Sequence, residues 1–375
     1  MKSNITGQWT GLSDQGSYFC VNIKQNGNEI SGMASSFQQF DNKTKKIWTW
    51  SKLKGNILDN GMVSGTSSGS TAYKHESGDL FTPVEITELK NQFDIELSIG
   101  SEFSGEVRDD NSLQLRSLIH FKGIDTVTSN VELDKVILKD SRIERIPMRW
   151  EDFRAYIIQQ DDSLIYRGQA SHWALQTSYH RTGRSELISY MDNELPELAE
   201  HINAISPIQY NTLDNNSLGT LLNLAQHHGY PTPLLDWTKS PYVAIFFALA
   251  DEMALKGSKE VSIFTFNQKK WVELSGKIAK IRVPNSIVKI VDLPKSGNSR
   301  ALPQQSKIMY SNVIDIENYI LSNEATSGEL IECISISISE RSKILRDLRL
   351  MGISWASLFP GFDGVCKEFK MNHFN

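Results

Sequence analysis

The chain has 375 residues, enough for two domains, and its 39% hydrophobic and 22% charged residues are ordinary for a globular protein. Its 39 basic and 44 acidic residues leave a net charge of −5, which excludes an extended basic surface for nonspecific nucleic-acid or membrane binding. The three cysteines form no CxxC pair and no zinc spacing, so neither a disulfide framework nor a cysteine metal site is expected. Because we find no apolar signal segment and no apolar run of membrane-spanning length, we expect a cytoplasmic protein.

The first 143 residues have the pattern of an all-β domain. Two Asn-Gly pairs, at 26–27 and 60–61, indicate tight hairpin turns, and no segment of useful length has the helical period. The opening segment around Trp9 resembles the first strand of lipocalin-like barrels. We therefore predict an antiparallel barrel or sandwich, lipocalin-like or a meander, over residues 1–143, with strands at 18–23, 30–33, 62–65, 93–97, 113–115 and 131–133.

A polar connector at 141–147 leads into a second predicted domain, residues 144–375, in which strands and helices are mixed. The irregular alternation favours an α+β domain over a parallel doubly wound sheet. Ser217 is the expected cap of one helix, and Gly229 its end. The predicted elements are a strand at 164–168 that ends in a glycine turn, helices at 184–205 (with a break near Pro196), 218–228 and 339–351, a strand at 261–266, and a loop at 292–306.

Residues 226–241 are the densest candidate for a functional segment. A helix is expected to begin at Pro241 with Ser240 as its N-cap, and the unpaired N–H groups of such a helix start favour an anion. The same residues also fit an ordinary well-capped helix start. His227 and His228 lack the further ligands of a zinc site, so we expect His228 in the core and His227 facing a cleft.

Arg167, at the end of a predicted strand and followed by Gly168, is suited to holding a phosphate, although a surface arginine before a turn has the same pattern. Residues shortly after it either extend this anion site or belong to a solvated loop: His172, His180, Arg181 and Arg184. We expect positive charge to concentrate around Arg167, Arg181 and Arg184. The sequence contains no glycine-rich phosphate loop and no nucleophile elbow.

Four motifs follow one another in the second predicted domain. The first is Tyr166-Arg167-Gly168-Gln169, and the closing one is Leu358-Phe359-Pro360 with Asp363-Gly364. Between them lie the long block from Gln226 through Asp236, Trp237, Thr238 and Ser240-Pro241 to Ala248, and Arg300 with Gln304-Gln305. The FRG domain family has these motifs in the same order, and residues from about 148 onward resemble that family. Pro233 stands where the family usually has arginine, which puts an anion contact at that position in doubt.

This resemblance implies an ADP-ribosyltransferase-like fold that splits NAD+ in a cleft between two small sheets. The whole chain is similar to the toxin of bacterial toxin–antitoxin–chaperone antiphage systems that ADP-ribosylates mRNA. The implied function is NAD+-dependent mono-ADP-ribosyl transfer to RNA or protein, with NAD+ as substrate, no metal, and an antitoxin and a chaperone as partners. The alternatives are an NAD+ glycohydrolase and a non-catalytic nucleotide-binding sensor. The N-terminal domain is expected to be a docking platform in preference to a ligand-holding barrel.

The resemblance also assigns roles to individual residues. The transferase chemistry passes through an oxocarbenium-like state, and an anion near the reacting ribose stabilises that state. Transferases of this kind usually place a glutamate there, whereas this chain offers Gln304 and Gln305, so Asp236 or Asp363 is expected to compensate. The expected catalytic residues are Arg167, Thr238, Ser240, Asp236 and Gln305, and the expected NAD+-binding residues are Tyr166, Arg167, Gly168, His227, Tyr230 and Trp237.

Overall fold

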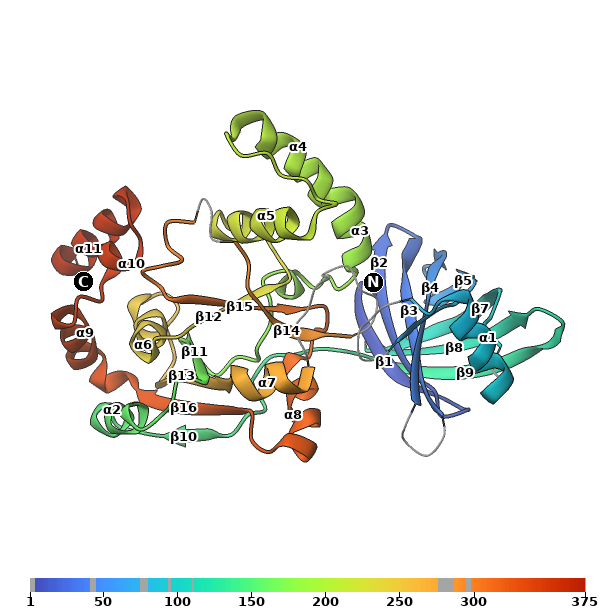
Figure 1. The fold of residues 1–375 in the computed structure, drawn as a ribbon, viewed down its shortest axis with the longest axis horizontal. Coiled ribbons are helices and arrows are strands. Elements are labelled where there is room, and N and C mark those ends of the chain that lie inside the picture. Colours follow the sequence, from blue (N-terminus) through green and yellow to red (C-terminus); the bar gives the residue numbers. More distant parts are fainter. Residues whose placement is uncertain are drawn as a thin grey trace. The chain divides into compact units, whose positions relative to one another are not determined.

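The structure is a computed structural model that describes residues 4–374 apart from 41–44, 75–79, 94–95, 110, 276–285 and 295–297. The chain forms two compact units, and each is described by itself (Figure 1). The first unit contains the described residues of 1–137, 179–200 and 280–287, and the second contains those of 138–178, 201–279 and 288–375. None of the helices in these ranges has the length and apolar character needed to cross a membrane.

The first unit is built around a closed antiparallel barrel, which confirms the barrel and excludes the sandwich. Its strands are β1 (Gly7–Ser13), β2 (Tyr18–Asn26), β3 (Glu29–Phe40), β4 (Lys45–Ile57), β5 (Met62–Ser68), β7 (Gly100–Asp109), β8 (Ser112–Phe121) and β9 (Ile124–Lys135). The bonded order is β3-β2-β1-β9-β8-β7-β5-β4, and pairing of β3 with β4 closes the ring, while β6 (Thr71–Lys74) adds to β4. Gly27 and Gly61 adopt φ values of 61° and 84°, as the predicted Asn-Gly turns require.

A short helix, α1 (Pro83–Phe93), interrupts the barrel strands and corrects the prediction that this region contains no helix. Its start is a capping box. The main-chain N–H of Thr82 donates to Oε2 of Glu85 at 2.8 Å, and that of Glu85 donates to Oγ1 of Thr82 at 3.3 Å. Pro83 fits the first helical position. The strand predicted at 93–97 is wrong at Phe93, which ends the helix, and its residues 94–95 lie outside the described residues.

The second unit contains a sheet whose strand order is β10-β16-β13-β11-β12-β15-β14. Its strands are β10 (Arg145–Pro147), β11 (Leu164–Gln169), β12 (Leu234–Thr238), β13 (Glu260–Asn267), β14 (Val288–Val291), β15 (Ser306–Ser311) and β16 (Ile331–Ser337). The pairing of β10 with β16 is parallel and the others are antiparallel, which confirms an α+β unit. A single residue pair, Tyr166 opposite Thr238, joins β11 to β12, so the sheet consists of two halves that separate there.

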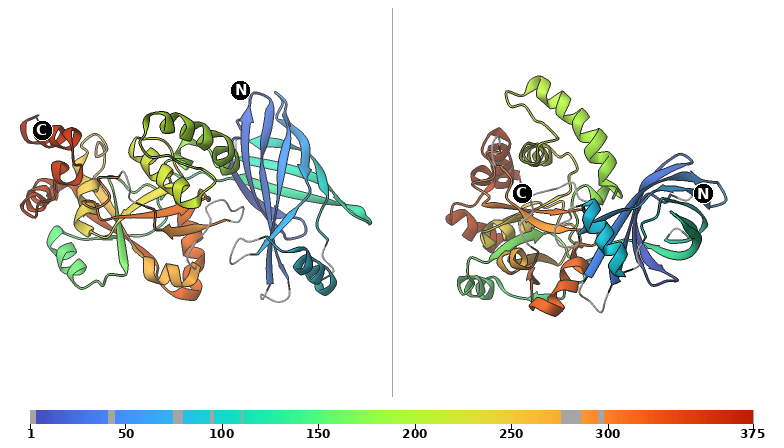
Figure 2. Two further views of the ribbon diagram at one scale, coloured as in Figure 1. Left: turned by 45° about the horizontal axis from the view of Figure 1, so that its top comes forward. Right: turned by 45° about the vertical axis from the view of Figure 1, so that its right-hand side comes forward.

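Helices cover this sheet, as the views in Figures 1 and 2 show. They are α2 (Trp150–Ile158), α5 (Asn215–His227), α6 (Pro241–Ala250), α7 (Gln268–Ser275), α8 (Ile316–Ser327), α9 (Arg341–Leu350), α10 (Trp355–Leu358) and α11 (Phe362–Phe374). Helix α6 contacts β11, β13 and α9 and contributes most of its residues to one core cluster, which explains why it is apolar on nearly every side. The predicted N-cap is confirmed, because Oγ of Ser240 accepts a hydrogen bond from Val243 N at 3.3 Å.

The structure corrects three other predicted elements. The strand does not end in a turn at Gly168 but continues to Gln169. Asp214, not Ser217, caps α5, since its Oδ1 accepts the Ser217 N–H at 2.8 Å. The helix predicted at 184–205 is replaced by α3 (Leu187–Ser189), the π-helical η2 (Tyr190–Glu194) and α4 (Leu195–Ile205), and α4 begins beside the break predicted near Pro196; η1 (His180–Thr182) precedes them. Helices α10 and α11 follow the last predicted helix and were not predicted.

Candidate functional site

A pocket of about 340 Å³ opens in the second unit where β11 and β12 meet. It brings together residues from all four of the motifs that the sequence analysis singled out. Its lining residues are Tyr166, Arg167, Gly168, Asn223, Gln226, His227, Asp236, Trp237, Thr238, Ala244, Phe247, Asn298, Arg300, Gln304, Ser306 and Phe359. Seven of the predicted site residues are among them: Tyr166, Arg167, Gly168, His227, Asp236, Trp237 and Thr238.

Arg167 spans the split between the two half-sheets. Successive residues of a strand face opposite sides, so the Tyr166 side chain lies in the core, where burial raises its pKa to about 12, and Arg167 lies on the other face. Nη1 of Arg167 donates to the main-chain oxygen of Asp236 at 2.6 Å. The arginine therefore carries a fixed positive charge at the junction, anchored to backbone and not to the carboxylate of Asp236.

Strand β12 alternates in the same way. Asp236 is exposed, whereas Trp237 is only 3% exposed, and its ring packs against Phe266 with the ring centroids 5.6 Å apart. This burial leaves the predicted contact between the Trp237 ring and nicotinamide unsupported. The alternation thus presents a carboxylate next to the pocket and turns the indole into the core.

Thr238, the last residue of β12, connects three segments. Its Oγ1 donates to the main-chain oxygen of Gln304 at 2.7 Å and accepts the N–H of Ser240 at 3.0 Å. Ser240 is 8% exposed and caps α6, and it does not line the pocket. Thr238 and Ser240, which were predicted as catalytic residues, therefore hold the start of α6 and the loop at Gln304 in position.

The facing wall comes from the loop before β15 and from Phe359. The guanidinium carbon of Arg300 lies 5.0 Å from the centroid of the Phe359 ring. Asn298 holds the loop, since its Oδ1 accepts the N–H groups of Arg300 and Ala301, each at 3.0 Å. Nε2 of Gln304 donates to Leu358 O at 3.0 Å. The pocket thus contains a second guanidinium group with its own aromatic support.

His227 lines the pocket, as predicted, at the end of α5. Burial lowers the pKa of His227, the nearby Arg300 charge lowers it further, and a hydrogen bond with Asn298 opposes both. The imidazole is therefore neutral at pH values at and above about 6.5, the usual pKa of a histidine. Its neighbour His228 is exposed, so the prediction that His228 is a core residue is wrong. Within the described ranges, no three His, Cys, Asp or Glu residues are arranged to hold a metal.

Three other predicted residues do not line the pocket: Gln305, Tyr230 and Asp363. Gln305 is exposed and has the left-handed φ of 49°, and its main-chain oxygen accepts the N–H of Lys239 at 3.0 Å. Gln304, the other glutamine of the pair, is the one that reaches the pocket. Asp236 is therefore the carboxylate that the pocket offers for the anionic role.

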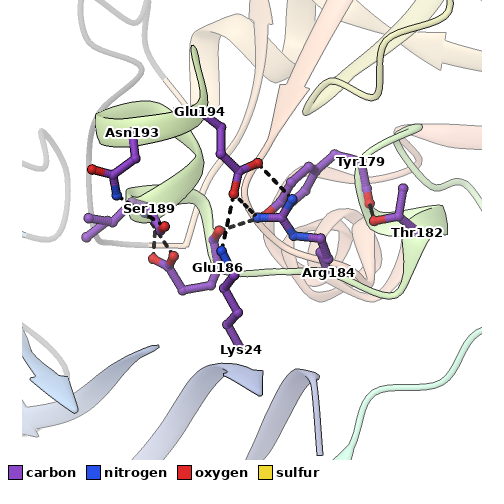
Figure 3. A network of polar contacts seen from close by, with 9 residues as sticks. Lys24, Tyr179, Thr182, Arg184, Glu186, Ser189, Asn193 and Glu194 are labelled. Atoms are coloured by element: carbon purple, nitrogen blue, oxygen red, sulfur yellow. Dashed lines mark hydrogen bonds and ion pairs between the residues drawn. The ribbon is translucent and has the colours of Figure 1, made fainter. Parts of the chain in front are cut away.

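Arg184, one of the arginines predicted to form a positive cluster after β11, is paired with a carboxylate. Both terminal nitrogens of Arg184 donate to Glu194, at 2.8 and 2.6 Å, and Lys24 shares that carboxylate at 3.3 Å (Figure 3). His180 is buried, which lowers its pKa to about 3, so it does not belong to a solvated loop. Arg181 is exposed and belongs, with Arg184, to the first unit, whereas Arg167 belongs to the second.

His172 is likewise not part of an anion site. Its ring stacks on Phe264 with the centroids 6.3 Å apart, and burial lowers its pKa. The positive charge of the pocket comes instead from Arg167 and Arg300. Among the lining residues that were not predicted as site residues are Asn223 and Asn298, which stand in no motif, and Phe359, which stands in the closing motif.

Residues 162–256 match the family model described as the FRG domain. The match includes β11, α5, β12 and α6, and therefore Arg167, His227 and Asp236. Arg300 and Phe359, which complete the pocket, lie outside the matched segment. No curated protein matches the chain. The match supports the FRG resemblance for this part of the chain.

Proposed function

We propose that the second unit binds NAD+ in this pocket and transfers its ADP-ribose to RNA, as a mono-ADP-ribosyltransferase. One observation carries the proposal: the pocket lies where the two half-sheets separate and holds two guanidinium groups, aromatic rings and one carboxylate. A dinucleotide has the complementary features, a doubly charged pyrophosphate between two flat rings. The FRG match of the segment that supplies Arg167 and Asp236 adds support.

Arg167 and Arg300 are the residues for the pyrophosphate. A guanidinium fork binds phosphate oxygens through paired, charge-assisted hydrogen bonds, which a lysine cannot reproduce. Phe359 and Phe247 line the same pocket and offer aromatic surface to a nicotinamide or adenine ring. Because Arg167 is anchored to the backbone of Asp236, little side-chain freedom is lost when the phosphate binds.

The reaction breaks the bond between C1′ of the ribose and N1 of nicotinamide. The electron pair leaves with nicotinamide, which becomes neutral, and positive charge develops on C1′ and the ring oxygen. The carboxylate of Asp236 stabilises that charge. A nucleophile of the target then forms a bond to C1′ and gives up its proton, for which Asp236 is the acceptor that the pocket provides.

RNA is the proposed target, as an mRNA in antiphage defence, and a protein side chain is the alternative. The chain has net charge −5, so RNA is contacted locally and briefly and not through a basic surface. A base must be unstacked or already single-stranded to reach a pocket of this kind. A toxin of this type requires partners that silence it in its host, and an antitoxin and a chaperone are the proposed ones.

The test is incubation of the purified chain with NAD+ labelled in its adenylate part, total RNA and cell lysate. We expect label on RNA and release of nicotinamide. Arg167→Ala should abolish both, since it removes one of two pyrophosphate ligands, whereas Arg149→Ala, a change at an exposed arginine outside the pocket, should leave both unchanged. If the wild-type chain neither consumes NAD+ nor labels a macromolecule, the proposed transferase is wrong.

The same assay distinguishes the transferase from the alternative function, an NAD+ glycohydrolase. We retain this alternative because the carboxylate in the pocket, Asp236, has a shorter side chain than the usual glutamate. Nicotinamide release without labelled RNA or protein identifies hydrolysis. Binding of NAD+ in calorimetry without turnover identifies the non-catalytic sensor. Asp236→Asn is expected to retain NAD+ affinity within a few-fold and to lose turnover by about a hundredfold or more, the size typical of losing one electrostatic stabiliser.

A further inference from the structure

The barrel of the first unit encloses a cavity of about 210 Å³. All eight strands of the ring contribute lining side chains, and Ile86 and Leu89 of α1 contribute as well. Protein interiors are normally packed with few voids larger than a water molecule. A cavity of roughly 150 Å³ with apolar walls is already large enough to bind benzene. The barrel interior is therefore of ligand size.

The lining changes chemically along the barrel, from an apolar level to a level of hydroxyl side chains. On β8 and β9 the inward pairs run Leu113–Leu133, Leu115–Val131 and then Ser117–Ser129. Strands β3, β4 and β5 change in the same direction, from apolar residues to hydroxyls, and beyond Ser117 the lining of β8 is apolar again, at Ile119 and Phe121. The hydroxyl level consists of Ser13, Ser36, Thr49, Ser67, Ser101, Ser117 and Ser129, and the apolar level of Val21, Ile23, Ile30, Leu53, Val63, Leu113, Leu115, Val131 and Leu133.

The hydroxyl level is stable without a ligand and is still able to bind one. Ser36 and Thr49 share a hydrogen bond of 2.6 Å, and Ser67 and Ser101 share one of 2.8 Å. A hydroxyl has one donor and two acceptor positions, so each pair keeps capacity for a further partner. Small side chains at this level also leave the space unfilled, although larger apolar residues there would bury more surface and fill the barrel.

Charge in the cavity is balanced. Of the described residues that line it, Lys90 and Glu96 are charged, and they form an ion pair with each other. Lys90 lies on α1, which follows β6 and precedes β7 in the sequence, and Ser101 lies near the start of β7. Figures 1 and 2 show α1 beside the barrel. A charged ligand would find no uncompensated charge among the described lining residues, whereas an uncharged ligand needs none.

We propose that the barrel binds a small uncharged amphipathic molecule, with its apolar part among the leucine, isoleucine and valine side chains and its polar group at the hydroxyl level. The ligand is somewhat larger than benzene and carries a hydroxyl, amide or ketone group. This binding site is separate from the NAD+ pocket and does not depend on the function proposed for it.

The test uses the full-length chain and the uncharged fluorescent probe 2-naphthol, which combines an apolar ring system somewhat larger than benzene with one hydroxyl group. We expect saturable binding with one site per chain and an increase in thermal stability with probe concentration. Ser101→Phe, which fills the cavity, should weaken binding by about tenfold or more. Ser104→Phe is the matched control, since it makes the same change on the exposed face of the same strand and should not alter the affinity.

Ala34→Phe, which fills the cavity from β3, replaces Ser101→Phe if circular dichroism shows that the latter does not fold. The proposal is overturned if the wild-type chain does not bind the probe, if folded cavity-filling variants bind it as well as Ser104→Phe does, or if NAD+ competes with it. Native mass spectrometry of the chain purified from cells supports the proposal if a neutral small molecule is retained by the wild type and lost from Ser101→Phe.

Discussion

Replacement of Gly168 by alanine tests the close packing on which the pocket depends. A Cβ atom at this position would lie 1.8 Å from the main-chain oxygen of Ala244 and 3.0 Å from Cβ of Ala248. An ordinary contact between carbon and oxygen is about 3.3 Å, so α6 and β11 would have to separate by roughly 1.5 Å. The obstacle is backbone, which cannot turn aside as a flexible side chain can.

Overpacking of this kind costs about 1–3 kcal/mol, and a backbone clash belongs at the upper end. A loss of about 3 kcal/mol corresponds to a decrease in Tm of roughly 6–12 °C in a domain of 150–250 residues. Gly168 and Ala244 both line the pocket, so the same separation moves its wall. We therefore expect NAD+ affinity to decrease by about tenfold or more in variants that remain folded.

Calorimetric melting and NAD+ titration of Gly168→Ala measure both effects. Gly219→Ala is the control, since its Cβ would meet only the flexible side chain of Leu293, whose Cδ2 is nearest at 2.6 Å, and alanine favours the helix by about 1 kcal/mol. We expect its Tm to stay near that of the wild type. A Gly168→Ala protein that melts and binds NAD+ like the control would refute the reasoning.

Three further predictions concern polar groups. Thr238→Val leaves the N–H of Ser240 and a carbonyl of Gln304 without their partner, and should lower stability by about 1–3 kcal/mol in urea titrations. Burial lowers the pKa of His180 from 6.5 to about 3 in the folded chain. As the pH falls between these two values, the unfolded chain binds a proton that the folded chain does not, so stability decreases. Between pH 7 and 5.5 we expect the free energy of unfolding to decrease by about 1 kcal/mol, and we expect no such decrease in His180→Leu. Glu194→Gln weakens the pairing with Arg184 and Lys24, and should make residues 179–200 more susceptible to limited proteolysis.

Local signals in the sequence predicted the local structure well. Asn-Gly pairs predicted the hairpins, and Ser240-Pro241 predicted the start of α6, because a few neighbouring residues determine each of these conformations. Helix α1 was missed although Thr82 and Glu85 form a capping box at its start. The helix is short and largely polar, so its apolar residues show little helical periodicity. The capping box is visible in the sequence, but without that periodicity it was not recognised as a helix start.

The site was predictable only in part, because its geometry is set by contacts between distant segments. Which of Asp236 and Trp237 faces the pocket depends on the strand face, and a sequence does not show which face is covered. Likewise, Arg300 meets Phe359 only because the loop before β15 folds toward the segment that follows α10. Motif order indicated which segments meet, whereas the folded chain was needed to show which side chains meet.

The anchoring of Arg167 bears directly on the missing glutamate. Its guanidinium donates to the carbonyl of Asp236, so in the proposed mechanism phosphate binding by Arg167 and charge stabilisation by the Asp236 carboxylate use different atoms of neighbouring strands. An Asp236→Asn chain keeps that carbonyl and hence the position of Arg167, while losing the negative charge. We therefore expect the two proposed functions to be separable by substitution. They would not be separable if Arg167 and the Asp236 carboxylate formed an ion pair, because removal of either partner would then disturb the other.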